Sequence, residues 1–182
     1  QRQMCIRDRL IGVLARAEST VSSLSDLLGG LVEKFAARGY SLYLVGGSVR
    51  DALLGRLGND LDFTTPARPD VVKEILDEWA ETVWDTGIDF GTVSAAYKGQ
   101  QIEITTFRSD SYDGQSRNPE VVYGDTLEGD LVRRDFKVNA MAIELLADAS
   151  FTFHDPLHGL QDVADRVLDT CLLYTSPSPR DS

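Results

Sequence analysis

LVGGSVRDALLGRLGNDLDF, at residues 44–63, joins the end of one predicted strand to the start of the next through a glycine turn and a short helix. Gly46 and Gly47 stand between the strand and the helix. At such a turn, backbone N–H groups come close to a phosphate, and the helix N-terminus favours negative charge. Arg50 lies in the first helical turn, where the helix dipole disfavours a cation, so we expect it to serve a ligand. A glycine pair by itself is most often only a tight turn.

Asp60 and Asp62 open the second predicted strand, residues 60–65. Residues two apart in a strand share a face, with Cα atoms about 6.5–7 Å apart, so the two carboxylates converge while Leu61 enters the core. Two such carboxylates repel unless a cation neutralises them, and Mg²⁺ prefers a few carboxylates together with substrate phosphates. A lone Asp-x-Asp is more often a turn cap beside a surface residue. The preceding glycine turn and Arg50 favour a magnesium site.

Glu103 lies in a second alternating segment, residues 101–107. It shares a face with Gln101 and Thr105, while Ile102 and Ile104 point the other way. If this strand neighbours the Asp60–Asp62 strand, Glu103 completes a three-carboxylate site. Without that neighbour, an ordinary exposed strand glutamate is an equally good interpretation.

The remaining elements follow from apolar periodicity and turn residues. A further strand is predicted at residues 41–45, and hairpins at 91–107, around Lys98-Gly99, and at 140–155. Helices are predicted at residues 24–35, 70–81 and 126–140, and from residue 159 onward. Residues 108–125 are polar and rich in turn formers, so we expect a loop there.

The chain has 182 residues, 42% of them hydrophobic and 26% charged, which is typical of one soluble globular domain. No apolar run approaches the ~20 residues of a membrane span, and no signal segment opens the chain. We therefore expect a cytoplasmic protein.

Both ends of the chain resemble translated sequencing adapters: QRQMCIRDR at residues 1–9 and CLLYTSPSPRDS at residues 171–182. We exclude both ends from the predicted domain, which then covers residues 10–170; a natural disordered tail is the alternative. Cys5 and Cys171 lie in these ends and are the chain's two cysteines. A disulfide, a thiolate zinc site and a cysteine nucleophile are thus not expected.

Residues 10–170 contain 14 Lys and Arg against 27 Asp and Glu, a net charge of −13. This is the wrong sign for a general nucleic-acid-binding surface. Any RNA contact must be local, or must lie beyond residue 170.

Four motifs in order carry a family resemblance: residues 44–63, IEITTFR at 102–108, RRDFKVNAMA at 133–142 and DPLHGLQD at 155–162. Together they resemble the class II tRNA nucleotidyltransferases, or CCA-adding enzymes, and the related bacterial poly(A) polymerases. The resemblance implies a polymerase-β-like nucleotidyltransferase head, an α+β fold with a mixed or antiparallel sheet flanked by helices.

The resemblance also implies roles for individual residues. Asp60, Asp62 and Glu103 would be the catalytic carboxylates of a two-metal Mg²⁺ site, and the Gly46-Gly47 turn with Arg50 would hold the triphosphate. The nucleotide sugar and phosphates would be contacted by residues of the third motif: Arg133, Arg134, Asp135 and Asn139. A basic helix end that complements the helix dipole is the alternative for this segment. Lys137 departs from the family, which usually has a small hydroxyl residue there.

The implied activity is metal-dependent transfer of CMP and AMP from CTP and ATP to the 3′ end of tRNA. The family chooses nucleotides with an EDxxR helix in a neck domain, and grips tRNA mainly with further helical domains; the present sequence contains neither. Poly(A) polymerase, an A-adding or CC-adding specialist, and a nucleotide-binding fragment that is inactive alone therefore remain open. Small-molecule nucleotidyl transfer shares the glycine turn and Asp-x-Asp but does not explain residues 133–142.

His154 and His158 are four residues apart and suggest a metal pair. Pro156 between them disfavours the helical turn that such a pair requires, and the family resemblance implies a structural role for this motif. Ser48 has no nearby base and is interpreted as a turn residue.

Overall fold

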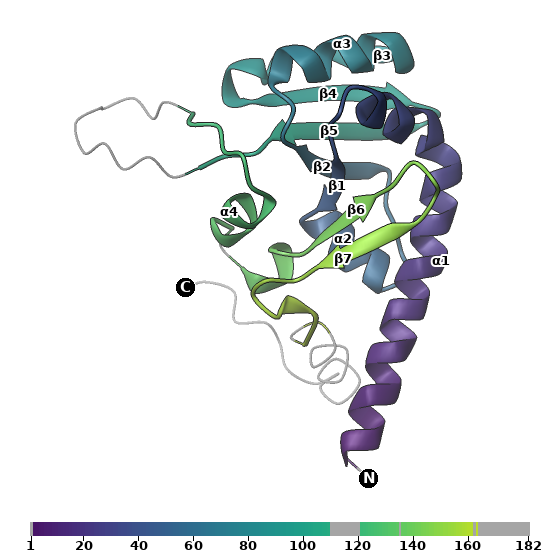
Figure 1. Ribbon diagram of the computed structural model, residues 1–182. Helices are drawn as coiled ribbons and strands as arrows, with labels where there is room; N and C mark the ends of the chain where they lie inside the picture. The colour runs from purple at the N-terminus through teal and green to yellow at the C-terminus, as the bar shows by residue number, and fades with distance from the viewer. Residues whose placement is uncertain (1, 110–120, 135, 162, 164–182) are drawn as a thin grey trace, which may run out of the picture.

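The computed structural model describes residues 2–109, 121–134, 136–161 and 163 (Figure 1). The helices are α1 (Arg2–Ala37), α2 (Gly47–Leu53), α3 (Pro69–Trp79) and α4 (Leu127–Val132), with 3₁₀ turns η1 (Ile88–Phe90) and η2 (Lys137–Asn139). The strands are β1 (Leu42–Val45), β2 (Asp60–Thr65), β3 (Thr82–Trp84), β4 (Thr92–Tyr97), β5 (Gln100–Thr106), β6 (Ala142–Leu145) and β7 (Phe151–His154).

The strands form one sheet in the order β3-β4-β5-β2-β1-β6-β7. Strands β2 and β5 run parallel, and the other neighbouring pairs in the described residues are antiparallel. The predicted α+β fold with a mixed sheet flanked by helices is confirmed.

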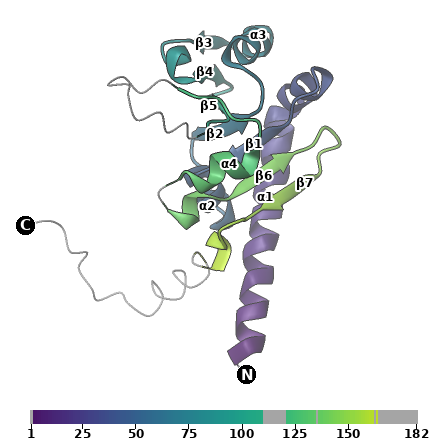
Figure 2. The same ribbon diagram turned by 60° about the vertical axis from the view of Figure 1, so that its left-hand side comes forward.

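The two faces of the sheet differ in what covers them. On one face, residues such as Leu44, Phe63 and Ile104 join the main core with the apolar side of α1 and with α3. On the other face, Val45 of β1 packs with Leu131 of α4 in a small separate cluster. Figure 2 shows α4 in front of the sheet and α1 behind it. The face toward α4 is thus the more open one, and Asp60 and Asp62 lie on it.

Helix α1 is longer than the predicted helix at residues 24–35, because its apolar positions continue back to Val13. Its last turns are tied to α3 by ion pairs, with Lys34 bound to Glu78 and Arg38 bound to Glu74 and Glu78. Figure 1 shows the N-terminal half of α1 running beyond the sheet. Residues 2–9 belong to this helix, and their adapter origin stays a prediction.

The strand at Asp60–Thr65 and both predicted hairpins are confirmed. The turn between β4 and β5 has positive φ at Lys98 (46°) and Gly99 (76°), as tight hairpin turns require. The helix predicted at residues 70–81 is confirmed as α3.

The single helix predicted at residues 126–140 is wrong. Helix α4 ends at Val132, and Phe136 is exposed instead of sharing the face of Leu127 and Leu131. The cause is tertiary: Leu131 packs beside Val45, and the chain must turn to deliver β6 to its pairing with β1. A continuous helix would carry the chain away from that strand.

Two other predictions are tested only in part. Within residues 108–125, an isolated bridge joins Arg108 to Tyr123, and residues 110–120 lie outside the described part of the chain. Helical residues begin at Gly159 as predicted, and most of that segment also lies outside the described residues. None of the described helices combines the length and apolar character that a bilayer crossing demands.

Candidate active site

The Asp-x-Asp strand and the Glu103 strand are neighbours, as the three-carboxylate prediction requires. Because β2 and β5 pair in parallel, Asp62 lies opposite Glu103 and Asp60 opposite Gln101. Asp60, Asp62 and Glu103 are exposed, whereas Leu61 is fully buried on the other face. The three carboxylates therefore share the open face of the sheet.

Asp62 has the electrostatic environment of a cation ligand. Although the Asp62 side chain is exposed as a whole, partial desolvation of its carboxylate raises its pKa; the positive charge of Arg134 acts to lower this pKa, and the neighbouring charge of Asp60 raises it further. The carboxylate thus loses hydration and faces a like charge, with one guanidinium as partial compensation. A bound cation would remove this penalty.

Ser48 fixes the start of β2. The backbone N–H of Asp62 donates to Ser48 Oγ at 3.0 Å, and the same hydroxyl donates to the carbonyl of Asp60 at 3.5 Å. Ser48 is buried in the first turn of α2, so the glycine-turn helix holds the strand that carries both aspartates. The sequence suggested only a turn residue, because it gives no sign of a contact 14 positions away.

The glycine turn contains a backbone conformation that glycine adopts more easily than other residues. Gly46 precedes α2 with φ 66° and ψ −140°, a conformation that favours glycine. Arg50 folds back over the turn: its Nη2 lies 3.4 Å from the position a Cβ on Gly47 would occupy. Arg50 Nε also pairs with Asp51 at 3.2 Å. The structure thus brings Gly47 and Arg50 together, as predicted for a triphosphate contact.

Arg134 connects the third motif to the turn and to β2. A Cβ on Gly46 would lie 3.5 Å from Arg134 Nη1 and 4.0 Å from Asp62 Oδ2. Arg133 and Arg134 also line a cavity of about 310 Å³, together with Thr105, Arg108 and Asp130. Arg134 therefore lies beside Asp62 and shares a cavity with two further arginines, Arg108 and Arg133.

The last two predicted nucleotide-binding residues are less well placed. Asn139 is half-buried in η2, and its Oδ1 is enclosed without a hydrogen-bond partner in the described part of the chain. Asp135 lies outside the described residues. An unpaired buried acceptor is costly, so a ligand donor at Asn139 would be stabilising.

The donor set suits Mg²⁺. Among the described residues, no three His, Cys, Asp or Glu side chains are close enough to hold a metal ion as they stand. Magnesium does not require such a cage, since one or two carboxylates with water and substrate phosphates are its usual ligands. Asp60 and Asp62, with Glu103 opposite, provide hard oxygen donors of that kind.

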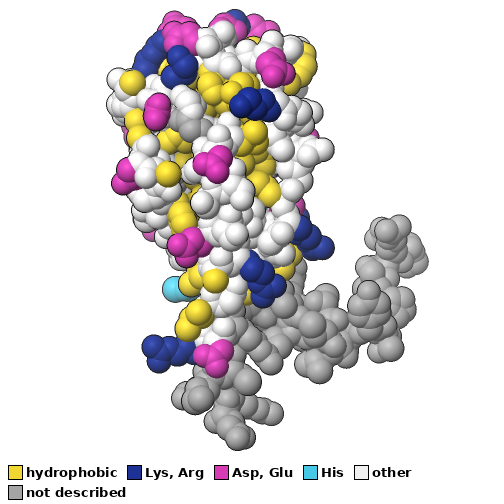
Figure 3. Space-filling model, turned by 90° about the vertical axis from the view of Figure 1, so that its right-hand side faces the viewer, with side chains coloured by type: hydrophobic (Ala, Val, Ile, Leu, Met, Phe, Trp, Pro, Cys, Tyr) yellow, Lys and Arg dark blue, Asp and Glu magenta, His cyan; other side chains and the backbone are white. Residues whose placement is uncertain are grey.

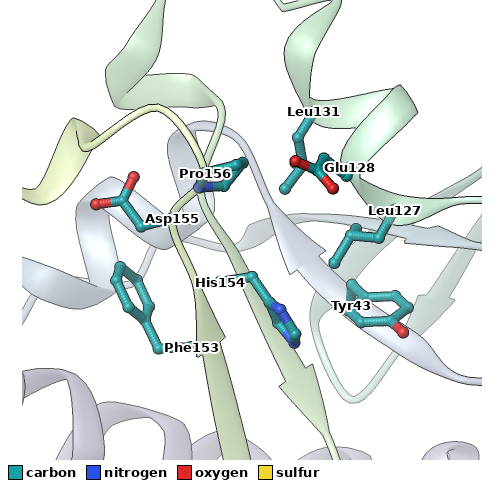
Figure 4. A pocket seen from close by; sticks show the side chains of 8 residues that line it. All are labelled: Tyr43, Leu127, Glu128, Leu131, Phe153, His154, Asp155 and Pro156. Atoms are coloured by element: carbon teal, nitrogen blue, oxygen red, sulfur yellow. The ribbon is translucent and has the colours of Figure 1, made fainter.

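A second cavity, of about 460 Å³, contains none of the predicted site residues. Figure 4 shows His154 and Phe153 of β7 on one side and Tyr43 and α4 on the other. The His154 ring lies edge-on to Tyr43, and its Nε2 is 3.4 Å from Glu144 Oε2. His158 follows in a turn with φ 58°. No helical turn joins the two histidines, which agrees with the structural role expected of them.

Positive charge is local on this acidic protein. Figure 3, a view onto the α1 side, shows Lys and Arg interspersed with Asp and Glu. By contrast, Arg108, Arg133 and Arg134 line one cavity, Arg134 lies beside Gly46, and Arg50 lies over Gly47. These arginines form a local basic surface on an acidic chain.

The sequence pattern described as the poly(A) polymerase head domain matches residues 42–169 of this chain. The chain belongs to this family. All predicted site residues of this family member lie within the matched segment.

The CCA-adding enzyme of Staphylococcus saprophyticus subsp. saprophyticus is 37% identical over 150 residues, which are 82% of this chain and 36% of that enzyme. The crystal structure of the Bacillus stearothermophilus CCA-adding enzyme in complex with CTP is 36% identical with a TM-score of 0.61, covering 76% of this chain and 31% of that one. A tRNA nucleotidyltransferase complexed with a primer tRNA and an incoming ATP analogue is 29% identical with a TM-score of 0.57, covering 80% and 36% of the two chains.

These likenesses confirm the predicted polymerase-β-like head fold and the resemblance to CCA-adding enzymes. The chain spans about a third of the length of these relatives.

Proposed function

We propose that this chain is the catalytic head of an RNA nucleotidyltransferase that adds CMP and AMP, from CTP and ATP, to the 3′ end of tRNA. The observation that carries the proposal is that Asp62 and Arg134 lie together beside Gly46, with Glu103 opposite Asp62 in the neighbouring strand. Carboxylates for a cation and guanidinium groups for phosphates are the two requirements of phosphoryl transfer. The CCA-adding relatives support the choice of RNA and nucleotides.

Asp60 and Asp62 would hold Mg²⁺, with Glu103 as the third carboxylate. Bound Mg²⁺ would lower the pKa of the RNA 3′ hydroxyl and stabilise the charge on the departing pyrophosphate. The hydroxyl oxygen then forms a bond to the α-phosphorus, its proton leaves, and the bond to pyrophosphate breaks.

The remaining residues would bind and orient the nucleotide. Arg50, folded over Gly47, and Arg134, beside Gly46, would bind the triphosphate and neutralise its charge. Asn139 Oδ1 would accept a hydrogen bond from a hydroxyl of the sugar, which would satisfy this enclosed oxygen. Arg133 would contact the phosphates from the cavity that it lines.

Residues 10–170 would form the head domain, and residues 1–9 and 171–182 would be adapter-derived. The parts of the relatives that this chain does not span would choose the nucleotide and grip tRNA. A head that binds nucleotide but does not extend RNA by itself is compatible with this division.

The test is extension of a tRNA that lacks its 3′ CCA, by the full-length protein that carries this chain, with Mg²⁺, CTP and ATP. Sequencing of the products should show C, C and A added and then a stop. A long A tail would identify a poly(A) polymerase head instead, and a single A or two C residues would identify a specialist. Absence of any extension by the full-length protein would contradict the proposed function.

A further inference from the structure

Asp130 is an enclosed carboxylate outside the residues predicted for the site. It lies in α4 and is 6% exposed. Both of its oxygens have partners: the backbone N–H of Arg108 donates to Oδ1 at 2.9 Å, and Arg134 Nη2 donates to Oδ2 at 3.2 Å. A buried charge is costly unless it is paired and hydrogen-bonded, so these contacts fix the carboxylate and its two partners together.

Arg134 spans the space between Asp130 and the glycine turn. While Nη2 faces Asp130, Nη1 lies 3.5 Å from the position of a Cβ on Gly46, a position that is itself 4.0 Å from Asp62 Oδ2. Arg134 Nε is buried without a hydrogen-bond partner in the described residues, so the guanidinium is not held through that nitrogen. Because the guanidinium is planar, fixing Nη2 also sets the direction in which Nη1 points.

The second partner of Asp130 belongs to the strand that carries Glu103. Arg108 follows the end of β5, so the hydrogen bond from its backbone N–H ties α4 to that strand. Arg108 also donates through Nη2 to the carbonyl of Phe90. Asp130 is the acidic member of a cavity lining that contains three arginines. The Asp130 carboxylate thus links the end of the Glu103 strand to Arg134, the residue of the third motif whose guanidinium lies beside Asp62.

We propose that Asp130 is a positioning residue for nucleotidyl transfer, which holds Arg134 toward Asp62 and the glycine turn so that its guanidinium meets the triphosphate. The inference rests on the proposed function and adds to it a residue that does not itself touch the nucleotide. Asp130 acts through Arg134, so its effect should disappear when Arg134 is absent. A carboxylate that only supports the fold would act independently of Arg134.

The experiment is a double-mutant cycle in the full-length protein that carries this chain: wild type, Asp130→Asn, Arg134→Gln and the double variant. Asparagine keeps the size of the side chain and the acceptor for Arg108 but removes the charge that pairs with Arg134. The measurements are kcat and KM for CTP and ATP, binding of Mg²⁺-CTP by calorimetry, and the melting temperature.

We expect each single variant to lower kcat/KM by about ten- to a hundredfold and to weaken Mg²⁺-CTP binding, whereas the double variant falls no further than Arg134→Gln. Asp130→Glu keeps the charge and should recover part of the loss. The matched control is Asp125→Asn, which breaks the ion pair with Arg68 at a side chain that is 91% exposed, and it should leave kcat/KM unchanged.

Losses that add independently in the double variant would overturn the positioning role, even if every variant is less active. If Asp130→Asn does not fold, the cycle with Asp130→Glu and Arg134→Gln decides the same question. A wild-type protein that binds neither CTP nor ATP overturns the inference together with the proposed function. That outcome can be distinguished from a failure of the positioning role alone, because the wild-type protein itself would then not bind nucleotide.

Discussion

Asp62 is predicted to bind the metal ion, and its charge also affects the stability of the fold. Its backbone N–H binds Ser48, its carboxylate lies on the open face opposite Glu103, and Arg134 approaches it from the third motif. Partial loss of hydration raises the pKa of Asp62. A carboxylate in this setting costs stability when it is charged and regains that stability when a cation binds.

Asp62→Asn is therefore expected to raise the melting temperature of the metal-free protein at neutral pH. With a raised pKa, the folded protein binds the Asp62 proton more tightly than the unfolded chain, whose pKa is near 3.8, so stability falls as pH rises from that value to the folded one. The loss of stability is less than about 1 kcal/mol for this screened carboxylate. It is fully present above the folded pKa of Asp62 and absent below the unfolded pKa. Thermal melts across this pH range check the prediction, and a gain that does not grow with pH would contradict it.

The position of individual residues on the strands was predictable from sequence where the signal was local, whereas contacts between distant positions were missed. Asp60 and Asp62 follow from a two-residue period, and Glu103 from the same pattern in another strand. Ser48 and Asp130 carry no such pattern. Ser48 binds Asp62, 14 residues on, and Asp130 binds the backbone of Arg108, 22 residues back, so only the fold brings these groups together. The pairing of Asp130 with Arg134 spans four residues, but the sequence predicted a different course for this helix.

At the level of elements, strands and hairpins were predictable because alternating apolar residues and turn-forming residues are signals between neighbouring positions in the sequence. The boundaries of β2 were correct, and so was the hairpin around Lys98-Gly99. The helix at residues 126–140 failed because its apolar spacing continues past the point where α4 must stop. Packing of Leu131 beside Val45 and pairing of β6 with β1 override the local pattern.

Gly159→Ala tests how closely the C-terminal helical segment meets η2. A Cβ at this position would overlap the backbone carbonyl of Lys137, which cannot rotate away as a side chain would. We expect a loss of about 2 kcal/mol or more in the free energy of unfolding. Chemical denaturation measures it, with Gly58→Ala as control because nothing lies within 4 Å of that Cβ position. Equal stability of both variants would show that the segment does not pack as described.

On the scale of the whole molecule, the sheet order was beyond the reach of the sequence. Five of the neighbouring strand pairs in the described sheet are antiparallel. Nothing in the local sequence indicates that β2 pairs with β5 in parallel and not with β3 or β4. The three-carboxylate site depends on that pairing. From the residues alone, the three-carboxylate site could be predicted only if the two strands were neighbours. The family resemblance supplied the reason to expect that they are.

A shortened chain tests the predicted domain limits. Removal of residues 1–9 and 171–182 should change the free energy of unfolding by less than about 1 kcal/mol. Among the α1 side chains that the structure describes, the buried ones begin at Val13, whereas Arg7 and Asp8 are exposed. Denaturation of the chains 1–182 and 10–170 side by side gives the answer. A large loss in the shorter chain would mean that the ends belong to the folded domain.

The most direct test of the central claim is the rate at which the full-length protein adds CMP to a tRNA lacking its 3′ CCA when Asp60 or Asp62 is replaced by alanine. We predict that either variant loses about a thousandfold or more in turnover, has a melting temperature no lower than that of the wild type, and is not rescued by more Mg²⁺. The exposed Asp89→Asn serves as the matched control and should retain full activity. Normal turnover by either alanine variant would contradict the assignment of this face of the sheet as the site of nucleotidyl transfer.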